Sequence, residues 1–414
     1  MKVKQVAIVV KYFPSVSETF IVNQINALID QGYGVTLFAY NQVENIPIHN
    51  SLLKHDLLNK VHYFIKPPVS KWRRFKSFIF WTWHNRNEIV WSRFFKTLNI
   101  FSYCKDAYTL KLFFEAQWFL LPYTFKIIHA HFGMNGERIA YLKDKGIIPN
   151  KVKLITTFHG YDLVPNTLKD YQASYKHILN QANAFTVNTP YLENLLQQVN
   201  INKTPCYILP VGLDTTFFKQ TSSKKETPCF NILFCGKLIS LKGPDLAVKI
   251  VKKLHELGHN LVRLHIIGEG MLRDKLKEDI IDLDLQDAVF LYGNQSQADL
   301  KLSFEQADVF LLPGRHDTKT GRAETQGLVI QEAQSMELPV VVSNVGGMKY
   351  GLIPGKTGFV VNENNVEEFV KAIEKLILNQ ELKINMGKKG RQFVEQYYDN
   401  SVLIEKLIEI YNEF

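Results

Sequence analysis

The chain has 414 residues, more than one hydrophobic core usually holds, so two domains are expected. Its hydrophobic content of 46% and charged content of 21% are those of a globular protein, and no apolar run approaches the roughly 20 residues that span a bilayer. The net charge of +9 admits nucleic acid, anionic lipid or a small anionic substrate, but no nucleic-acid-binding signature is evident. The four cysteines lack metal-ligand spacing and disulfide density, which indicates reduced thiols in a cytoplasmic protein.

The first patterned segment predicts the opening of a parallel α/β domain. Val6–Val10 is typical of a buried strand, and Val35–Phe38 of a second one. Between them, Ser15 and Glu18 fit a capping box for a helix that runs to about Asp30. Ligands bind such sheets at the carboxyl ends of the strands, so the loop that follows the first strand should face a cleft.

The texture changes between about residues 66 and 125, where basic and aromatic residues alternate at roughly helical spacing. The members are Lys71, Arg73, Arg74, Lys76, Arg86, Arg93 and Lys96, together with Trp72, Phe75, Phe78, Phe80, Trp81, Trp83, Trp91, Phe94 and Phe95. This pattern is typical of basic amphipathic helices that lie on an anionic membrane surface. The alternative is a set of ordinary helices that bury their aromatic side chains and expose their charges.

Two loops that contain histidine follow strands later in the first domain. Ile127–Ala130 is a predicted strand that leads to His131, and Leu154–Phe158 is another that leads to His159. Both loops leave the carboxyl end of a strand, so both can reach the same cleft. His131 also admits a purely local role, a hydrogen bond within its own loop. Strands at Phe185–Val187 and Tyr207–Leu209 complete the first domain, which we expect to end near residue 215.

A second alternation of strands and helices follows a polar linker at 216–228. We expect strands at Ile232–Phe234, Leu264–Ile267, Val289–Leu291, Val309–Leu312 and Val340–Val342, with a helix from Gly243 to Leu257. This order predicts a second doubly wound sheet over 229–393. The tail, 394–414, alternates apolar and charged residues at helical spacing.

Two acids flank the start of a predicted helix in the second domain. Glu324 lies in a polar loop after the strand at Val309–Leu312, and Glu332 lies about one and a half turns into the helix that begins near Gly327. Unpaired N–H groups at a helix start suit phosphate, so the pattern offers two carboxylates beside an anion site. The alternative is a solvated helix start that happens to be acidic.

Several motifs occur together and in a consistent order. Glu324–Glu332 resembles the E-x7-E signature of the large family 4 of retaining nucleotide-sugar glycosyltransferases, and Phe234–Gly243 resembles that family's strand–GRL–KG loop. His159–Asp162 resembles its H-G-x-D element, Pro210–Asp214 its P-x-G-x-D element, and the loops at 345–347 and 355–358 its late glycine loops. The resemblance covers nearly the whole chain and is weakest between about 66 and 125.

Four positions depart from the family pattern. The segment Phe13–Phe20 resembles the opening of transferases that build bacterial exopolysaccharide such as colanic acid, but Ser17 and Glu18 stand where many relatives have two glycines. Lys237 stands where the family usually has Arg, which keeps the charge but loses the bidentate fork. Tyr350 stands where relatives often have Glu.

The resemblance implies a GT-B fold, in which two doubly wound Rossmann-like domains, 1–215 and 229–393, face each other across a cleft and a last helix, 394–414, crosses back to the first domain. It implies catalytic roles for His159, which would line the donor-sugar site, and for Glu324, which would contact the donor sugar near its reacting face.

The same resemblance assigns the nucleotide site. Lys237 and Lys242 would bind the donor diphosphate, together with the N–H groups of Gly327 and Leu328. Glu332 would accept hydrogen bonds from the ribose hydroxyls. No metal ion and no cofactor is implied, because fixed cations and a helix N-terminus can stabilise a leaving diphosphate.

Three residues, Ser17, Glu18 and Asp162, are assigned to the acceptor side of the cleft. For the first two, the alternative is that they only cap the helix that follows them.

The implied activity is transfer of a hexose from UDP- or GDP-sugar to a lipid-linked glycan or oligosaccharide in bacterial cell-surface polysaccharide biosynthesis. The enzyme would be cytoplasmic and peripherally attached to the anionic inner face of the membrane, with no nucleic-acid partner. One alternative is a nucleotide-sugar-binding protein of the same fold without transfer activity. A glycogen-phosphorylase-like enzyme would need a pyridoxal-phosphate lysine motif, which is not found.

Overall fold

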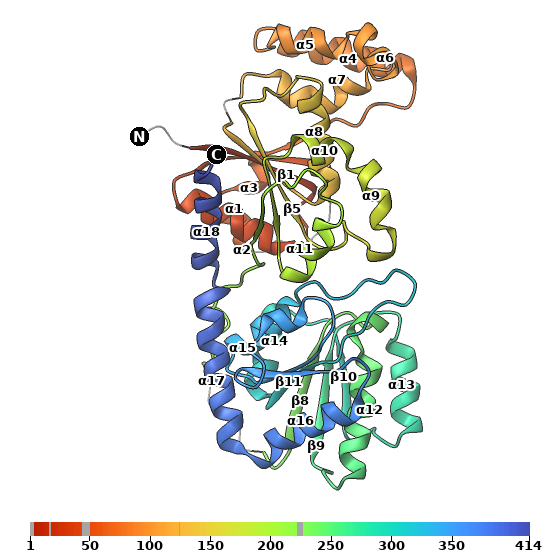
Figure 1. Cartoon of the computed structure of the whole chain (residues 1–414), viewed down its shortest axis with the longest axis vertical. Coiled ribbons are helices and arrows are strands. Elements are labelled where there is room, and N and C mark those ends of the chain that lie inside the picture. Colours follow the sequence, from red (N-terminus) through yellow and green to blue (C-terminus); the bar gives the residue numbers. More distant parts are fainter. Residues whose placement is uncertain (1–3, 16–17, 44–49, 124, 222–226) are drawn as a thin grey trace.

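The computed structural model describes residues 4–15, 18–43, 50–123, 125–221 and 227–414. Two parallel sheets form two domains, stacked along the long axis of the molecule (Figure 1). The first sheet has the order β3-β2-β1-β4-β5-β6-β7. Its strands are β1 (Gln5–Phe13), β2 (Gly34–Gln42), β3 (Val61–Tyr63), β4 (Ile127–His131), β5 (Lys153–Phe158), β6 (Ala184–Val187) and β7 (Cys206–Ile208).

The second sheet has the order β10-β9-β8-β11-β12-β13. Its strands are β8 (Phe230–Cys235), β9 (Val262–Ile267), β10 (Val289–Gly293), β11 (Val309–Leu312), β12 (Val340–Ser343) and β13 (Gly358–Val361). In both sheets the strand order reverses beside the first strand, between β1 and β4 and between β8 and β11. Crevices form at such reversal points, beyond the carboxyl ends of the strands.

Helices cover both faces of the first sheet. On one face, α1 (Thr19–Asp30) packs beside α18 (Asn400–Asn412), and both contribute to one apolar cluster. The other face carries α8 (Gly133–Asp144) and α10 (Lys176–Gln181). The remaining elements are α2 (Asn50–Leu53), α3 (Leu57–Lys60), η2 (Pro165–Thr167), α9 (Leu168–Ser174) and α11 (Pro190–Gln197).

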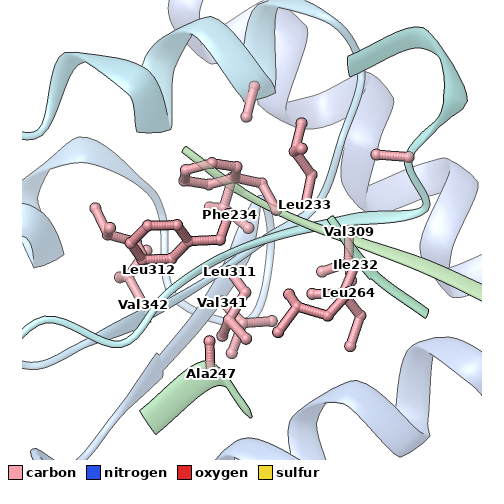
Figure 2. Packing of buried hydrophobic residues seen from close by; sticks show 14 of the residues in the cluster. Ile232, Leu233, Phe234, Ala247, Leu264, Val309, Leu311, Leu312, Val341 and Val342 are labelled. Atoms are coloured by element: carbon pink, nitrogen blue, oxygen red, sulfur yellow. The ribbon is translucent and has the colours of Figure 1, made fainter. Parts of the chain in front are cut away.

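The second domain is built around its β-branched strands. Residues from β8, β9, β11 and β12 interdigitate with Ala247 of α12 (Pro244–Glu256), and this cluster excludes water from both sheet faces (Figure 2). The other elements are η3 (Ser240–Lys242), α13 (Arg273–Asp282), α14 (Gln297–Gln306), α15 (Leu328–Ser335), η4 (Met348–Gly351), α16 (Val366–Leu378) and α17 (Gln380–Tyr397).

Two helix boundaries differ from those expected. The helix predicted to begin at a Ser15 capping box begins at Thr19, and Glu18 occupies the N-cap position without a side-chain capping bond. The tail is two helices rather than one, because the backbone leaves the helical course after Tyr397 and Asp399 caps α18 through the N–H of Ser401. α17 runs along the second domain, and α18 returns to the first (Figure 1).

The basic and aromatic segment forms α4 (Lys71–Asn85), α5 (Trp91–Thr97), α6 (Ile100–Tyr108), α7 (Lys111–Ala116) and η1 (Gln117–Leu120). Its aromatic side chains divide into two groups. Phe78, Trp81, Phe94, Phe113, Phe114 and Phe119 are buried in the core of the first domain. Trp72, Phe75, Phe80, Trp83, Trp91, Phe95 and Phe101 are exposed. The segment therefore supplies core packing and also an exposed aromatic surface.

This basic and aromatic segment lies at the pole of the first domain that faces away from the second domain (Figure 1). α8 starts at the carboxyl end of β4, so its C-terminal end lies beside the amino ends of the strands. Lys96 Nζ donates to Gly146 O at 2.8 Å and the hydroxyl of Tyr103 to Lys145 O at 2.8 Å, just beyond that helix end. A membrane bound at this pole would therefore not face the opening of the cleft. Within the described ranges, no helix combines the length and hydropathy needed to cross a bilayer.

Candidate active site

The carboxyl ends of β8 and β11 bring Lys242 and Glu324 together. Lys242 ends the short η3 turn after β8, and Glu324 lies in the loop between β11 and α15. The ammonium of Lys242 donates to Oε2 of Glu324, and each side chain is 17% exposed. An ion pair at this depth is only partly solvated, so its charges remain strongly coupled.

The carboxylate of Glu324 also accepts a hydrogen bond from the backbone N–H of Gly327, at 3.1 Å from Oε1. Burial alone would raise the pKa of Glu324, but the Lys242 ammonium and the backbone N–H groups of Gln326 and Gly327 lower that pKa below its ordinary value. Gly327, with φ of 73°, is the N-cap of α15. The Gly327 N–H, expected to be open to a phosphate, therefore donates to Glu324 here.

Glycines hold the Glu324 loop against the rest of the domain. The N–H of Gly347 donates to Glu324 O at 2.7 Å. A Cβ at Gly347 would lie 1.7 Å from Thr325 O, and one at Gly346 would lie 2.2 Å from Glu324 O. Only glycine permits this backbone approach, so the loop 345–347 sets the position of Glu324.

The loop after β8 is packed in a similar way. A Cβ at Gly268 would lie 2.0 Å from Gly236 O, and one at Gly270 would lie 2.5 Å from Leu238 O. The glycines after β9 therefore serve the close approach of two loops. Lys237 lies between these contacts with its side chain exposed. Lys237 and Lys242 lie on the same loop after β8, and so on the same side of the crevice.

Glu332 lies in α15, facing the end of β8. Burial raises the pKa of Glu332 to about 7. Burial also raises the pKa of Cys235 to about 12, with a contribution from the charge of Glu332 and an opposing one from Lys242. The charges of Glu332 and Lys242 thus both act on Cys235 at the end of β8. Leu328 is the first residue of α15, where the helix supplies no partner for the leading N–H groups.

Thr325, next to Glu324, connects the two domains. Its hydroxyl donates to His159 O at 3.1 Å, and its carbonyl accepts from the hydroxyl of Thr189 at 2.8 Å. Gln326 adds a reciprocal pair with the backbone of Val211, each bond 2.8 Å long. These contacts bring the H-G-x-D loop and the two-acid loop to the same crevice.

The histidine and aspartate of the first domain have different environments. The His159 ring packs 5.0 Å from Phe20 of α1 and 4.6 Å from Phe132. Asp162 is buried, and its carboxylate accepts from the N–H groups of Gly133 and Gly160 at 2.9 and 2.8 Å. Asp162 thus ties the two histidine loops together, and backbone N–H groups of both loops occupy its carboxylate.

Of the two residues assigned to the acceptor side at the start of α1, the structure describes only Glu18. Ser17 lies outside the described residues. Glu18 is half-buried, and burial raises its pKa to about 7 against the opposing charge of Lys11. Its Oε2 is buried and has no hydrogen-bond partner among the described residues.

The structure adds residues that sequence reasoning did not single out. Thr325 and Gln326 lie inside the E-x7-E stretch, but their contacts join residues more than a hundred positions apart. Arg315 pairs with Asp245 and donates to Ser240 O at 2.8 Å, which fixes the η3 turn that carries Lys242. Among the described residues, no cluster of three or more His, Cys, Asp or Glu side chains is arranged to hold a metal ion.

Known solved structures share this architecture. HepE from Anabaena, in a complex with UDP, superimposes with a TM-score of 0.73 at 13% identity, over 99% of this chain and 100% of that one. A glycosyltransferase from Rickettsia africae gives 0.71 at 18% identity, over 100% and 99%. These similarities show the GT-B fold, two Rossmann-like domains with a cleft between them.

Sequence comparisons identify the family. WcaL of Escherichia coli (strain K12), whose name assigns it to colanic acid biosynthesis as a glycosyltransferase, is 26% identical over 96% of this chain and 97% of its own length. The amylovoran biosynthesis glycosyltransferase AmsK of Erwinia amylovora is 25% identical over 96% and 97%. Residues 17–217 match the model of Glycosyltransferase Family 4, and residues 214–393 match that of Glycosyl transferases group 1. The chain therefore belongs to the family 4 glycosyltransferases with the GT-B fold.

Proposed function

We propose that this glycosyltransferase moves a hexose from UDP- or GDP-sugar, with retention of configuration and without a metal ion, to a lipid-linked glycan of a cell-surface polysaccharide. The names of WcaL and AmsK support exopolysaccharide biosynthesis. Complexes of HepE with UDP and with UDP-glucose support a nucleotide-sugar donor. The single observation that carries the proposal is the Lys242–Glu324 pair at the start of α15.

The crevice groups suit a nucleoside diphosphate. Lys242 and Lys237 are two cations on the loop that follows β8, and the start of α15 adds partial positive charge. When a diphosphate leaves with its negative charge, fixed cations stabilise that charge without needing to reorganise. Lys242 would exchange part of its contact with Glu324 for the diphosphate oxygens.

The two acids would take different parts of the donor. Glu324 would face the reacting sugar, where its lowered pKa keeps the carboxylate charged. Glu332, in α15, would accept hydrogen bonds from the ribose hydroxyls when it is ionised. His159 would reach the sugar from the first domain, because Thr325 fixes its backbone beside Glu324.

The first domain is proposed to meet a membrane through α4, α5 and α6. Their exposed aromatic side chains include Phe80 and Trp83, 73% and 69% exposed, beside the exposed cations Lys71, Arg73 and Lys76. Aromatic and basic residues together suit the headgroup region of an anionic leaflet. Because this surface lies opposite the cleft, the acceptor end would extend past the first domain to reach the donor.

A thermal-shift screen against UDP, GDP and ADP, each alone and as the sugar nucleotide, tests the donor. We expect the nucleotides of one base to stabilise the chain. When a glycan acceptor is added, the matching sugar nucleotide should be converted to the free nucleoside diphosphate. Stabilisation without transfer to any acceptor would favour a binding protein. A shift with none of the three nucleotides would contradict the proposal.

A further inference from the structure

Three histidines lie together at the carboxyl ends of β4 and β5. His129 and His131 lie two positions apart on β4, and their rings stack at 4.7 Å. His129 lies within 2.6 Å of the Tyr411 hydroxyl through Nδ1 and within 2.6 Å of the Thr157 hydroxyl through Nε2. Both of its ring nitrogens are therefore occupied by groups of the core.

His131 has a different arrangement. Its Nδ1 lies 3.1 Å from Nε2 of His159, a hydrogen bond between the ends of two neighbouring strands. His131 is 1% exposed, and none of the described residues offers a partner to its Nε2. The hydrogen bond to His159 is therefore the polar contact that its ring makes.

Only one of the two rings can supply the hydrogen atom of this bond. Burial lowers the pKa of His131 well below its ordinary value and that of His159 to about 3, so both imidazoles are neutral near pH 7. A neutral imidazole carries one hydrogen, on either nitrogen. If His159 donated, the hydrogen of His131 would lie on its buried Nε2, where the described residues place no acceptor.

The opposite arrangement leaves only an unused lone pair on His131, and a buried acceptor without a partner is tolerated better than a buried N–H. We infer that His131 is a positioning residue, which donates from Nδ1–H to Nε2 of His159 and thereby holds His159 as its Nδ1–H tautomer. In that form, His159 offers a hydrogen-bond donor from Nδ1 and no donor from Nε2. The consequence for catalysis rests on the proposed function, because it requires that His159 contact the donor sugar; the tautomer itself does not.

The tautomer can be read directly by ¹⁵N NMR of the full chain labelled at histidine. The chain has 12 histidines, so His159 is assigned by the signal that disappears in His159→Phe. The wild type is expected to show a protonated Nδ1 at His159. A protonated Nε2 at His159 in the wild type would overturn the inference without any variant of His131.

Two variants of His131 separate positioning from packing. His131→Phe keeps an aromatic ring but removes the donor, so His159 should shift toward its Nε2–H tautomer, which free imidazole side chains prefer. His131→Asn places an amide N–H where Nδ1 was, and should retain the Nδ1–H form. An unchanged His159 tautomer in folded His131→Phe would also overturn the inference.

Tyr411→Phe provides a matched control. It removes a buried hydroxyl that contacts His129 but leaves the bond between His131 and His159 in place. It should lower thermal stability without changing the tautomer of His159.

With an active donor, His131→Phe should lower kcat at least tenfold with little change in affinity for the free nucleoside diphosphate, and His131→Asn should restore most of kcat. If His131→Phe changes the tautomer of His159 but the wild type binds no sugar nucleotide, the proposed function is refuted and the positioning role stands.

Discussion

The ammonium of Lys242 donates to the carboxylate of Glu324, and this ion pair joins the loop after β8 to the loop before α15 across 82 positions of sequence. Each partner lowers the cost of burying the other. The pair therefore places a cation and a carboxylate at the same point of the crevice, both in their charged forms.

We expect Lys242→Met to destabilise the fold, because it leaves the Glu324 carboxylate buried without its cation. The loss should be about 3 kcal/mol at pH 7, a typical cost of breaking such a pair. Urea unfolding should show that Lys242→Met combined with Glu324→Gln recovers most of it. A double variant as unstable as the sum of the two single variants would show that the two residues are not coupled.

The same pair predicts a pH dependence. The pKa of Glu324 lies below its ordinary value of 4.5 in the folded chain, so its ionised form stabilises the fold above that pH, and the contribution disappears as the pH falls through the lowered value. The stability difference between wild type and Glu324→Gln should therefore vanish in acid.

Glu324→Gln should lower kcat more than donor affinity, because its proposed contact is with the reacting sugar. Glu332→Gln should chiefly weaken binding of the nucleoside diphosphate, by about tenfold or more, as expected for a lost hydrogen bond to a charged group. Steady-state kinetics and calorimetry separate the two effects. Small, equal effects of both substitutions on kcat and affinity would favour the alternative, in which the two acids only belong to a solvated helix start.

The pH dependence of binding tests Glu332 separately. Ribose hydroxyls donate to the ionised carboxylate, whose pKa is about 7, so nucleotide affinity should rise as the pH increases from 6 to 8. Glu332→Gln should remove that rise. Burial raises the pKa of Glu332 from 4.5 to about 7, so the wild type should lose stability relative to Glu332→Gln as the pH rises from 4.5 to 7, because the unfolded chain ionises this carboxyl before the folded chain does.

Gly347→Ala should displace the loop that carries Glu324, because its Cβ would lie 1.7 Å from Thr325 O. We expect a loss of about 1–3 kcal/mol in unfolding free energy, as for other overpacked sites, together with a lower kcat. Gly355→Ala is the control. It introduces a Cβ with nothing within 4 Å at φ of 71°, so it should cost stability through the backbone alone and leave kcat unchanged. Equal kcat losses in both variants would argue against the loop contact.

Fully buried strands were predictable from the sequence because each is an unbroken apolar run, as at Val309–Leu312. Two short strands were missed. β3 has three half-buried residues without alternation, and β13 begins at Gly358, which was interpreted as part of a loop. Neither strand shows an unbroken apolar run of about four residues or a clear alternation, so the local pattern carries little signal there.

The candidate site shows the same division. The motifs indicated Lys242 and Glu324, but the contact of Thr325 with His159 spans 166 positions and depends on how the domains pack. Aromatic residues of α4 were also ambiguous, because buried Trp81 and exposed Phe80 are neighbours in the sequence. Trp81 lies inside because its ring packs against Phe113 of α7, with ring centroids 5.3 Å apart.

The exposed surface of α4 predicts binding to anionic vesicles at low salt and release at high salt. Replacing Lys71, Arg73 and Lys76 by Glu should abolish co-sedimentation without unfolding the chain. Arg74 is left unchanged, because its guanidinium bonds to Pro68 O and Thr109 O hold α4 in place. The same charge change at three exposed lysines of the second domain, Lys275, Lys371 and Lys388, is the control and should leave binding intact. No sedimentation of the wild type at any ionic strength would refute the membrane proposal.

The most direct measurement is calorimetric titration of the wild type, Lys242→Ala and Lys237→Ala with UDP, GDP and ADP. The wild type should bind one of these nucleotides, and Lys242→Ala should bind it roughly tenfold to a hundredfold more weakly, as expected for a charge-assisted hydrogen bond of about 1.5–3 kcal/mol. Lys237→Ala, which removes a more exposed cation, should lose less. Equal affinity of the wild type and folded Lys242→Ala for the preferred nucleotide would remove Lys242 from the diphosphate site and contradict the account.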